Sequence, residues 1–382
     1  MSAADIRIKA VESKTDLMKF IKFPWQIYGN DPYWVPPLIR ERKTFLNPAK
    51  NPFFKHADVA LFLAQQGDET VGTIAAVIDD NYNTFQEEKA GIFGLFEVIE
   101  DYAVAQRLLS TARDWVKDRG MEIIRGPLNF SQNYEYALLV DGFDSRPVVL
   151  MTYNPRYYVD FIERFGFQKA RDLYAYTAEW SYYGGDVSGL PQKIFRVAEI
   201  ARRRKEILVR KARLKEDFEG EIEIAKTVYN SSWSKLWGFV PMTEEEFDYV
   251  AEGLKPFLDE DLIFIAEVDD QPVGFSLALP DINQALFHIR NGRLFPLGWL
   301  KFLWYSRKID TLRLFAMGII EEYRERGIDA LFYLEAAKAA LRKGYKRVEM
   351  SLILEDNEMT NRIIQRIGGK IYKTYRIYEM EL

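Results

Sequence analysis

Two arginines and a glycine stand where a strand-like stretch meets a helix-like one, in YRERGIDAL (323–331). The first turn of a helix leaves backbone N–H groups unpaired, and the helix dipole favours negative charge there. Arg324 and Arg326 would add charge-assisted bonds to phosphate oxygens, and Gly327 would let a ligand approach the backbone closely. The segment therefore predicts an anion site, although an exposed turn that ends a strand would have the same composition.

The composition limits other kinds of site chemistry. The chain has no cysteine, which excludes disulfides, thiolate metal sites and a cysteine nucleophile. Its two histidines, His56 and His288, are 232 positions apart, so we expect no multi-histidine metal site. The sequence shows no Ser-His-Asp set, no Gly-rich nucleotide-binding fingerprint and no zinc pattern. We therefore expect no metal cofactor.

The overall composition is that of a globular protein with two domains. Its 382 residues exceed the usual size of one domain, and 48% apolar residues allow sizeable cores. The formal charge of −5 leaves no basic footprint for nucleic acid. One basic stretch, RRRKEILVRKARLK (202–215), is interpreted as a solvated helix end and strand edge rather than an anion-docking site.

Two stretches bear on localisation. MSAADIRIKAVESK, at the N-terminus, has no apolar run, so we expect no secretory signal. The longest apolar-looking stretch, LFPLGWLKFLWY (294–305), is too short to span a bilayer and is interrupted by Lys301. We therefore expect a soluble cytoplasmic protein without stable membrane insertion, and we leave its oligomeric state open.

An internal duplication is present. FLAQQGDETVGTIAAVID (62–79) and FIAEVDDQPVGFSLALPD (264–281) are identical at seven of eighteen positions without gaps, and each is typical of a β-hairpin. Gly166 and Gly368, in FIERFGFQ and IIQRIGGK, are related by the same offset of 202 positions. Equal offsets at distant points indicate two homologous halves rather than chance similarity.

Insertions separate the two halves elsewhere. The offset becomes 224 between residues 91–120 and 315–344, because the second half inserts 283–313 and the first inserts within 126–150. A repeat of about 200 residues means tandem domains rather than a solenoid. The Gly/Ser/Pro-rich stretch 181–192 marks the boundary. The predicted division is a first domain at 1–182, a linker and lead-in at 183–219, and a second domain at 220–382.

Each half has the order helical lead-in, hairpin, strand, long helix, strand, short helix, strand. In the second half we predict strands at 262–268, 272–280, 312–320, 346–353 and 371–380, and helices at 328–343 and 357–367. The long helix carries apolar residues at the 3.6-residue period, at Ile328, Leu331, Leu334, Ala337 and Leu341. The fold class is α/β (α+β), with mixed, mostly antiparallel twisted sheets flanked by helices.

Together these features resemble the GCN5-related N-acetyltransferase (GNAT) superfamily. The family's pyrophosphate loop, Arg/Gln-x-x-Gly-x-Gly/Ala after the fourth strand, is matched by Arg324 to Asp329 except at the last position. The family also has an Asn followed eleven residues later by a Gly, as Asn357 and Gly368 are here. The resemblance covers most of 220–382 and, through the duplication, a degenerate copy in 1–180. It implies two tandem GNAT-like domains.

The resemblance also implies a site for acetyl-CoA or a longer acyl-CoA. The loop would cradle the coenzyme pyrophosphate, and the strands around Met317 would admit the pantetheine arm. An amide near Ile319 or Ile320 would polarise the thioester carbonyl, and Asn357 would bond the pantetheine. The implied coenzyme-binding residues are Ile319, Ile320, Arg324, Arg326, Gly327, Ile328, Asp329, Ala330 and Asn357. Asp329 would repel phosphate unless it points away and serves the helix dipole.

The catalytic acid and base are not identified by the sequence. Many family members carry a Tyr four residues before the matched Gly, where this chain has Ile364. Glu349 and Ser351 share one face of the preceding strand and are possible substitutes, as is Tyr323. Each also has a structural interpretation: a strand-edge acid, a neutral strand residue and a packed loop tyrosine.

The first half differs at the loop. At the constant offset, Glu100 lies over Arg324 and Ala103 over Gly327, so we expect that this half has lost coenzyme binding. A retained non-binding copy would shape an acceptor pocket between the two domains. The candidate acceptor-binding residues are Tyr134, Tyr153, Trp237 and Asn283, although such aromatics can also be core residues.

The leading hypothesis is an acyl-CoA-dependent N-acyltransferase that acylates the amine of an unknown small molecule. The missing Tyr and Asp329 favour an alternative, a non-catalytic acyl-CoA-binding sensor or scaffold. A third possibility is an aminoacyl-tRNA-dependent transferase, which the acidic charge disfavours. The acyl length and the acceptor stay open.

Overall fold

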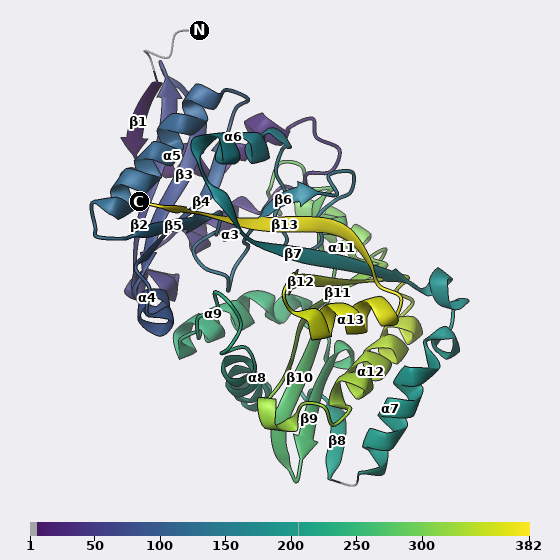
Figure 1. The fold of residues 1–382 in the computed structure, drawn as a ribbon. Coiled ribbons are helices and arrows are strands. Elements are labelled where there is room, and N and C mark those ends of the chain that lie inside the picture. The colour runs from purple at the N-terminus through teal and green to yellow at the C-terminus, as the bar shows by residue number, and fades with distance from the viewer. Residues whose placement is uncertain (1–5, 205) are drawn as a thin grey trace. The chain divides into compact units, whose positions relative to one another are not determined.

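The computed structural model describes residues 6–204 and 206–382. Met1–Asp5, at the start of the N-terminal stretch, and Lys205, in the basic stretch, lie outside the described residues. The chain divides into two compact units (Figure 1). Unit 1 runs to Asp172 and also includes Ala285–Trp304 and Lys373–Leu382, whereas unit 2 comprises Leu173–Gln284 and Tyr305–Tyr372.

Unit 1 is a mixed sheet with helices. Its strands are β1 (Ile6–Ala10), β2 (Ala57–Gln66), β3 (Glu69–Asp79), β4 (Ala90–Val98), β5 (Ile123–Gly126), β6 (Leu138–Asp141) and most of β13 (Lys370–Glu381). Its helices include α1 (Lys14–Lys22), α2 (Pro24–Tyr28), α3 (Ile39–Phe45), α4 (Asp80–Gln86), α5 (Tyr102–Lys117), α6 (Tyr157–Phe165) and most of α11 (Gly298–Ser306), with the 3-10 turn η2 at Pro52–Lys55. The strand order is β1-β2-β3-β4-β5-β13, and β6 also pairs with β13.

Helix α5 covers this sheet because its apolar residues recur at helical spacing. Val104, Leu108, Ala112 and Val116 are fully buried and pack in the unit 1 core with the buried residues of β3 and β4. Asp101 caps the helix by accepting from the amide of Ala103. The helix is thus fixed both by its buried face and at its N-terminus.

In unit 1, the gap beyond the parallel β4–β5 pairing is filled by the chain itself. The two strands pair only from Ala90 to Ile92 on β4. Beyond β5, the amide of Leu128 donates to the carbonyl of Phe93 at 2.9 Å, and the amide of Leu95 donates to Asn129 Oδ1 at 2.9 Å. A Cβ on Gly94 would lie 1.8 Å from the Leu128 carbonyl oxygen, so the backbone lies directly on that glycine.

Unit 2 repeats this architecture. Its strands are β7 (Gln168–Glu179) from Leu173 onward, β8 (Ile207–Lys211), β9 (Ile263–Val268), β10 (Gln271–Pro280), β11 (Thr311–Ile319) and β12 (Arg347–Leu354). Its helices include α7 (Gln192–Arg203), α8 (Phe218–Ser232), α9 (Glu244–Leu254), α12 (Ile328–Arg342) and α13 (Glu358–Arg366), with short 3-10 turns at Trp180–Tyr183, Val187–Gly189, Lys255–Phe257, Glu260–Leu262 and Glu321–Tyr323. The short helix α10 (Asn283–Leu286) lies where the chain passes from unit 2 to unit 1.

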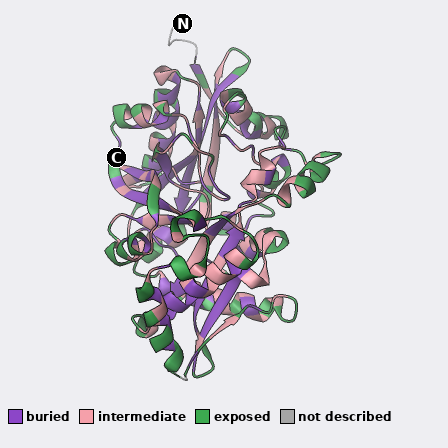
Figure 2. Ribbon diagram, turned by 90° about the vertical axis from the view of Figure 1, so that its right-hand side faces the viewer, coloured by how far each residue is buried: buried purple, intermediate pink, exposed green. Residues whose placement is uncertain are grey.

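The unit 2 sheet has the order β7-β12-β11-β10-β9-β8. β9 and β10 form the predicted hairpin, β11 and β12 are parallel, and β7 is antiparallel to β12. Buried residues gather on the strands and exposed ones on the outer turns of the helices (Figure 2). Ile328, Leu331 and Leu334 of α12 are buried in a core shared with α7.

The last strand of each half belongs to the sheet of the other half. Residues Leu173–Glu179, from the first half, pair with β12 in unit 2. Residues Lys373–Glu381, from the second half, pair with β5 and β6 in unit 1. The compact units are therefore composed differently from the tandem ranges 1–182 and 220–382 that the repeat predicts, and the predicted linker contains α7 and β8 of unit 2.

Substituting Gly94 tests whether the gap in unit 1 is filled. Gly94→Ala is expected to lower the free energy of unfolding by about 3 kcal/mol or more, because the new methyl group meets backbone that cannot rotate away. The control is Gly253→Ala in α9, where nothing lies within 4 Å and alanine favours the helix by about 0.5–1 kcal/mol. Urea denaturation measures both. Equal stability of Gly94→Ala and wild type would contradict the packing of Leu128 on β4.

Candidate functional site

The C-terminal ends of β11 and β12 diverge. The parallel ladder joins Thr311–Leu314 to Arg347–Met350 and ends there, although β11 continues to Ile319 and β12 to Leu354. Each strand is held on its outer side, β11 by β10 and β12 by β7. Within the described residues, the gap between β11 and β12 thus lies where the pantetheine arm is expected.

The register selects which β11 amides face this gap. The amide of Ile320 donates to the Val273 carbonyl at 2.9 Å, so it is engaged by the β10 side. Ile319 is paired with Gly274, and successive amides of a strand point to opposite sides. The amides of Ile319 and Met317 therefore point away from β10, toward β12. Of the two predicted oxyanion donors, the geometry favours Ile319 over Ile320.

The loop before α12 presents an uncapped helix end. Gly327 is the N-cap residue, with φ +85°, and no described side chain caps the helix. The amide of Leu331 makes the first intrahelical bond, to the Gly327 carbonyl, at 3.2 Å. The amides of Ile328, Asp329 and Ala330 precede it and have no partner within the helix. This arrangement suits an anion, as the sequence predicts.

Arg324 and Arg326 hold the loop in shape. The Arg324 guanidinium donates to the carbonyls of Ile319, at 3.1 Å, and Ser232, at 2.5 Å. Ser232 ends α8, where the helix dipole favours a cation. The Arg326 guanidinium lies 5.0 Å from the centre of the Tyr323 ring. Arg324 is thus partly used in fixing the loop, and Tyr323 packs under Arg326.

Gly327 also has a conformational and packing role. A Cβ at this position would lie 3.1 Å from side-chain atoms of Val197 and Ala201 on α7, and the positive φ is itself unfavourable for other residues. The glycine therefore allows a left-handed turn and close packing of α12 on α7. The role of Gly327 in letting a ligand approach stays a prediction.

Two further predicted binding residues take part in helix structure. Asp329 lies one turn before Tyr333, and burial together with the Asp329 charge raises the pKa of Tyr333. Asn357 caps α13, its Oδ1 accepting from the amide of Thr360 at 3.2 Å. The buried Asn361, which the sequence did not point to, instead donates to the Leu354 carbonyl at the end of β12, at 2.9 Å.

The predicted catalytic pair lies beside the gap, with a basic partner. Ser351 Oγ donates to Glu349 Oε2 at 2.9 Å, and both residues are buried. Arg313, directly opposite Glu349 on β11, has its Nε 3.8 Å from the same oxygen. Glu349 Oε2 is therefore flanked by a hydroxyl donor and a guanidinium.

The corresponding region of unit 1 has a much shorter loop. Three residues connect β4 to α5, whereas eight connect β11 to α12. Asp101 caps α5 where α12 has Gly327, so Glu100 and Ala103 are not the structural equivalents that the constant offset suggested. The carboxylate at the cap and the filled β4–β5 gap both support the expected loss of coenzyme binding in this copy.

No protein-family model matches the sequence. The chain is 36% identical over 392 aligned residues to the bacterial ceramide synthase of Caulobacter vibrioides, covering 99% of this chain and 98% of that protein. It is 35% identical over 381 residues to protein YghO of Escherichia coli, covering 98% and 95%. Both similarities extend over the whole chain, so they include both units.

Solved structures share the fold. A tandem GNAT protein from the clavulanic acid biosynthesis pathway matches 98% of this chain and 98% of its own, with a TM-score of 0.57 at 9% identity. A GCN5-related N-acetyltransferase from Sphaerobacter thermophilus matches 99% and 96%, with a TM-score of 0.52 at 14% identity. The chain belongs to the family of the bacterial ceramide synthase and YghO, and it has the fold of GNAT proteins.

The four predicted acceptor residues lie in different units. Tyr153 Oη donates to Asp31 in unit 1, and Tyr134 packs edge-on to Phe45. In unit 2, Trp237 follows α8 and is half-buried, and the Asn283 amide donates to Asp281 Oδ1. Three of these residues, Tyr153, Tyr134 and Asn283, have an identifiable packing or turn contact, and the role of all four toward an acceptor stays a prediction.

Glu97, on β4 of unit 1, is a titratable group that the sequence analysis missed. The hydroxyls of Tyr28 and Tyr158 both donate to its Oε2, at 2.7 and 2.8 Å, and no described group bonds Oε1. Burial raises the pKa of Glu97 to about 7, although both tyrosines oppose the shift. The Glu97 carboxyl is therefore expected to titrate near neutral pH. A single acid in the apolar run GIFGLFEV (91–98) was the available signal.

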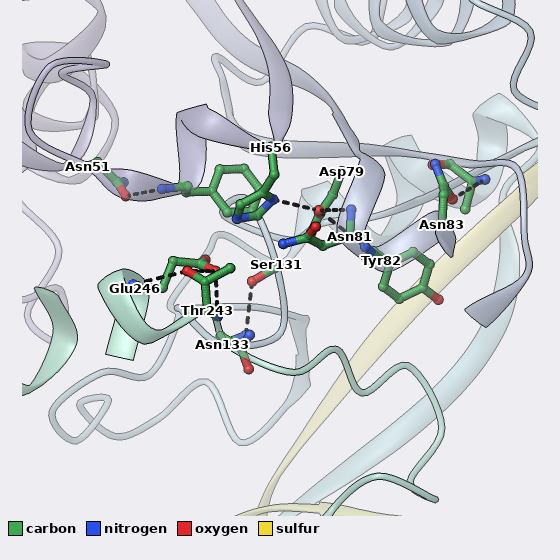
Figure 3. A network of polar contacts seen from close by, with 12 residues as sticks. Asn51, His56, Asp79, Asn81, Tyr82, Asn83, Ser131, Asn133, Thr243 and Glu246 are labelled. Carbon is green, nitrogen blue, oxygen red and sulfur yellow. Dashed lines mark hydrogen bonds and ion pairs between the residues drawn. The ribbon is translucent and has the colours of Figure 1, made fainter. Parts of the chain in front are cut away.

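A second polar pair in unit 1 is structural. His56 Nδ1 lies 3.0 Å from Asp79 Oδ1, and the same oxygen accepts from the amides of Asn81 and Tyr82 at the start of α4 (Figure 3). The pair therefore ties the start of β2 to α4. Within residues 6–204 and 206–382, no cluster of three or more His, Cys, Asp or Glu side chains could hold a metal ion.

The Glu97 carboxyl predicts a pH dependence of stability. Its pKa is higher in the folded chain than in the unfolded one, so its contribution to stability is complete below about pH 4.5 and is lost as the pH rises through about 7. Glu97→Gln should therefore gain stability relative to wild type between pH 5 and 8, by on the order of 1–3 kcal/mol. The control is Glu100→Gln, at an exposed residue. Urea denaturation between pH 5 and 8 measures the stability of both variants and of wild type. Parallel pH profiles for wild type and Glu97→Gln would contradict the raised pKa.

Coenzyme binding is predicted to depend on α12 alone. Asp329→Asn should tighten coenzyme A binding and Arg326→Gln should weaken it, each by roughly fivefold in Kd, because a charge near the phosphates changes. Asp101→Asn keeps the cap of α5 and should leave Kd unchanged. Isothermal titration measures all three. A changed Kd for Asp101→Asn would mean that unit 1 also binds coenzyme.

Proposed function

We propose that this protein is an acyl-CoA-dependent N-acyltransferase with one coenzyme site, in unit 2. The observation that carries the proposal is the contrast between the two copies. β11 and β12 diverge beside an uncapped α12, whereas the matching gap of unit 1 holds Leu128 and Asn129. The first-turn amides of α12, with Arg326, would bind the pyrophosphate, and the gap would take the pantetheine arm.

The proposed acceptor is a long-chain amino alcohol. The support is the similarity to the bacterial ceramide synthase along almost the entire chain. A ceramide is the amide of a fatty acid and a long-chain amino alcohol, so the matching donor is a long-chain acyl-CoA. The name of YghO gives no substrate, and its equal similarity neither supports nor opposes this acceptor.

The proposed reaction is direct transfer. The amine nitrogen attacks the thioester carbonyl carbon, the C–S bond breaks, the amine loses one proton and the leaving thiolate gains one. The Ile319 amide, which points into the gap, would stabilise negative charge on the carbonyl oxygen. Glu349, bonded by Ser351, is the proposed proton acceptor in unit 2. Tyr323 packs with Arg326, and we give it no step.

A second candidate is an acyl-CoA-binding protein without catalysis. It is favoured by Ile364, at the position where many family members carry a tyrosine, because this side chain is buried with Tyr176 and Met350. Tyr176 is itself buried, with its hydroxyl donating to Asn361 at 2.8 Å. A tRNA-dependent transferase has no such observation in its favour.

Acyl transfer should be detected with palmitoyl-CoA and a long-chain amino alcohol. We expect thiol release together with the amide product by mass spectrometry, and much lower rates with acetyl-CoA or a short polar amine. Glu349→Gln should lower kcat by roughly 100-fold or more with little change in coenzyme Kd, as for loss of a general base.

The control is Glu355→Gln, an acid just beyond the end of β12, which should keep wild-type kcat. Thermal unfolding of each variant separates folding from chemistry, since Glu349 is buried beside Arg313. Tight coenzyme binding without product from any amine would favour the non-catalytic candidate instead.

A further inference from the structure

Unit 1 carries a concentrated exposed apolar surface, which we call the apolar ridge. Six of the twelve exposed large hydrophobic residues in the described chain fall within ten consecutive positions. They are Phe295, Leu297, Trp299, Leu300, Leu303 and Trp304, with exposed fractions between 41% and 69%. Single exposed apolar residues need no explanation, but a contiguous group marks an interaction surface.

The helix within the ridge has no buried face. α11 reads GWLKFLWYS, so apolar residues surround it on nearly every side, and none of its residues is buried. A helix that is apolar all round is normally enclosed by protein or lipid. Nine residues are too few to cross a bilayer, and no helix in the described chain has the length and apolarity needed to do so.

The base of the ridge is anchored firmly. The Arg290 guanidinium donates to the carbonyls of Trp34, Gly29 and Asp31, at 2.9 to 3.2 Å. Trp25 Nε1 donates to the Arg290 carbonyl at 2.7 Å. These bonds, together with the buried Ile289, fix the segment before the ridge in unit 1. The ridge is therefore presented on a structured support.

The charged residues around the apolar ridge indicate which kind of partner would cover it. Residues 282–309 contain five Lys and Arg and no Asp or Glu, in a chain whose formal charge is −5. Arg293, Lys301, Arg307 and Lys308 are exposed around the apolar residues. Trp, Leu and Phe side chains flanked by basic residues are typical of segments that lie in the interface of an anionic membrane.

We propose that the apolar ridge docks this protein on the surface of an anionic phospholipid bilayer. Leu300, Leu303 and their neighbours would enter the headgroup boundary, and Arg293 and Lys301 would meet the lipid phosphates. The inference deepens the proposed function, because a bilayer would present a lipid amine. Membrane binding itself is independent of the reaction, since the ridge lies outside the α12 loop and the β11–β12 gap.

Vesicle sedimentation tests the proposal, with the full chain and no coenzyme or amine present. Wild type should bind vesicles of equal parts phosphatidylglycerol and phosphatidylcholine, and should bind pure phosphatidylcholine much more weakly. Leu300→Ser/Leu303→Ser should lower the partition coefficient by about tenfold or more, because two half-exposed leucines no longer enter the bilayer. Arg293→Gln/Lys301→Gln should lower it by roughly fivefold per cation.

The matched control is Ile200→Ser/Leu208→Ser in unit 2. These side chains are 50% and 54% exposed, close to the 49% and 52% of Leu300 and Leu303. The control should bind within twofold of wild type, and circular dichroism should show that every variant is folded. Binding should also fall at about 1 M salt, where the Debye length is about 3 Å.

Two results would overturn the proposal. One is wild-type protein that stays in the supernatant with anionic vesicles. The other is a dimer in sedimentation equilibrium that Leu300→Ser/Leu303→Ser dissociates, which would assign the ridge to a second copy of the chain. Because vesicle binding is measured without substrates, a failure here leaves acyl transfer to be judged by its own assay, and the reverse also holds.

Discussion

β12 is held in place by a strand from the other half of the chain, and the candidate site depends on that pairing. β7 pairs with β12 on one side, while β10 holds β11 on the other. Since each of the two central strands is fixed by its outer neighbour, they can separate beyond Leu314 and Met350 without either strand losing its place in the sheet. The same pairing positions Glu349 against Arg313 and leaves the Ile319 amide facing the opening.

The two copies show how a shared architecture gives one open site and one closed one. In unit 1 the chain after β5 turns back onto β4, and Asn129 satisfies the amide of Leu95. In unit 2 the longer loop reaches α12 without an acidic cap. Neither difference changes the strand order. The two gaps thus differ by a few backbone bonds and the length of one loop, whereas the surrounding sheet and helices are retained.

Much of this fold could be predicted because its elements are long and periodic. The strands and helices expected in the second half agree with β9 to β13, α12 and α13 to within one residue at each end. The edge strand β1 was missed because five residues carry little periodic signal, whereas β8 lies in the basic stretch that was interpreted as a helix end and strand edge. The exchange of β7 and β13 has no local signature, since either pairing buries the same residues. Glu97 could be recognised only with its two tyrosine partners in place, because they are distant in the sequence. Choosing Ile319 over Ile320 as the oxyanion donor required the strand register.

The exchanged strands also constrain how the gene can evolve. A protein built from two self-contained copies can discard one by a deletion or an early stop codon. Here a stop codon before β13 would remove from the first copy the strand that pairs with β5 and β6. A deletion of the first copy would likewise remove the strand beside β12. The copy whose strand gap is filled is therefore retained by structural necessity, and its surface remains free to acquire other roles.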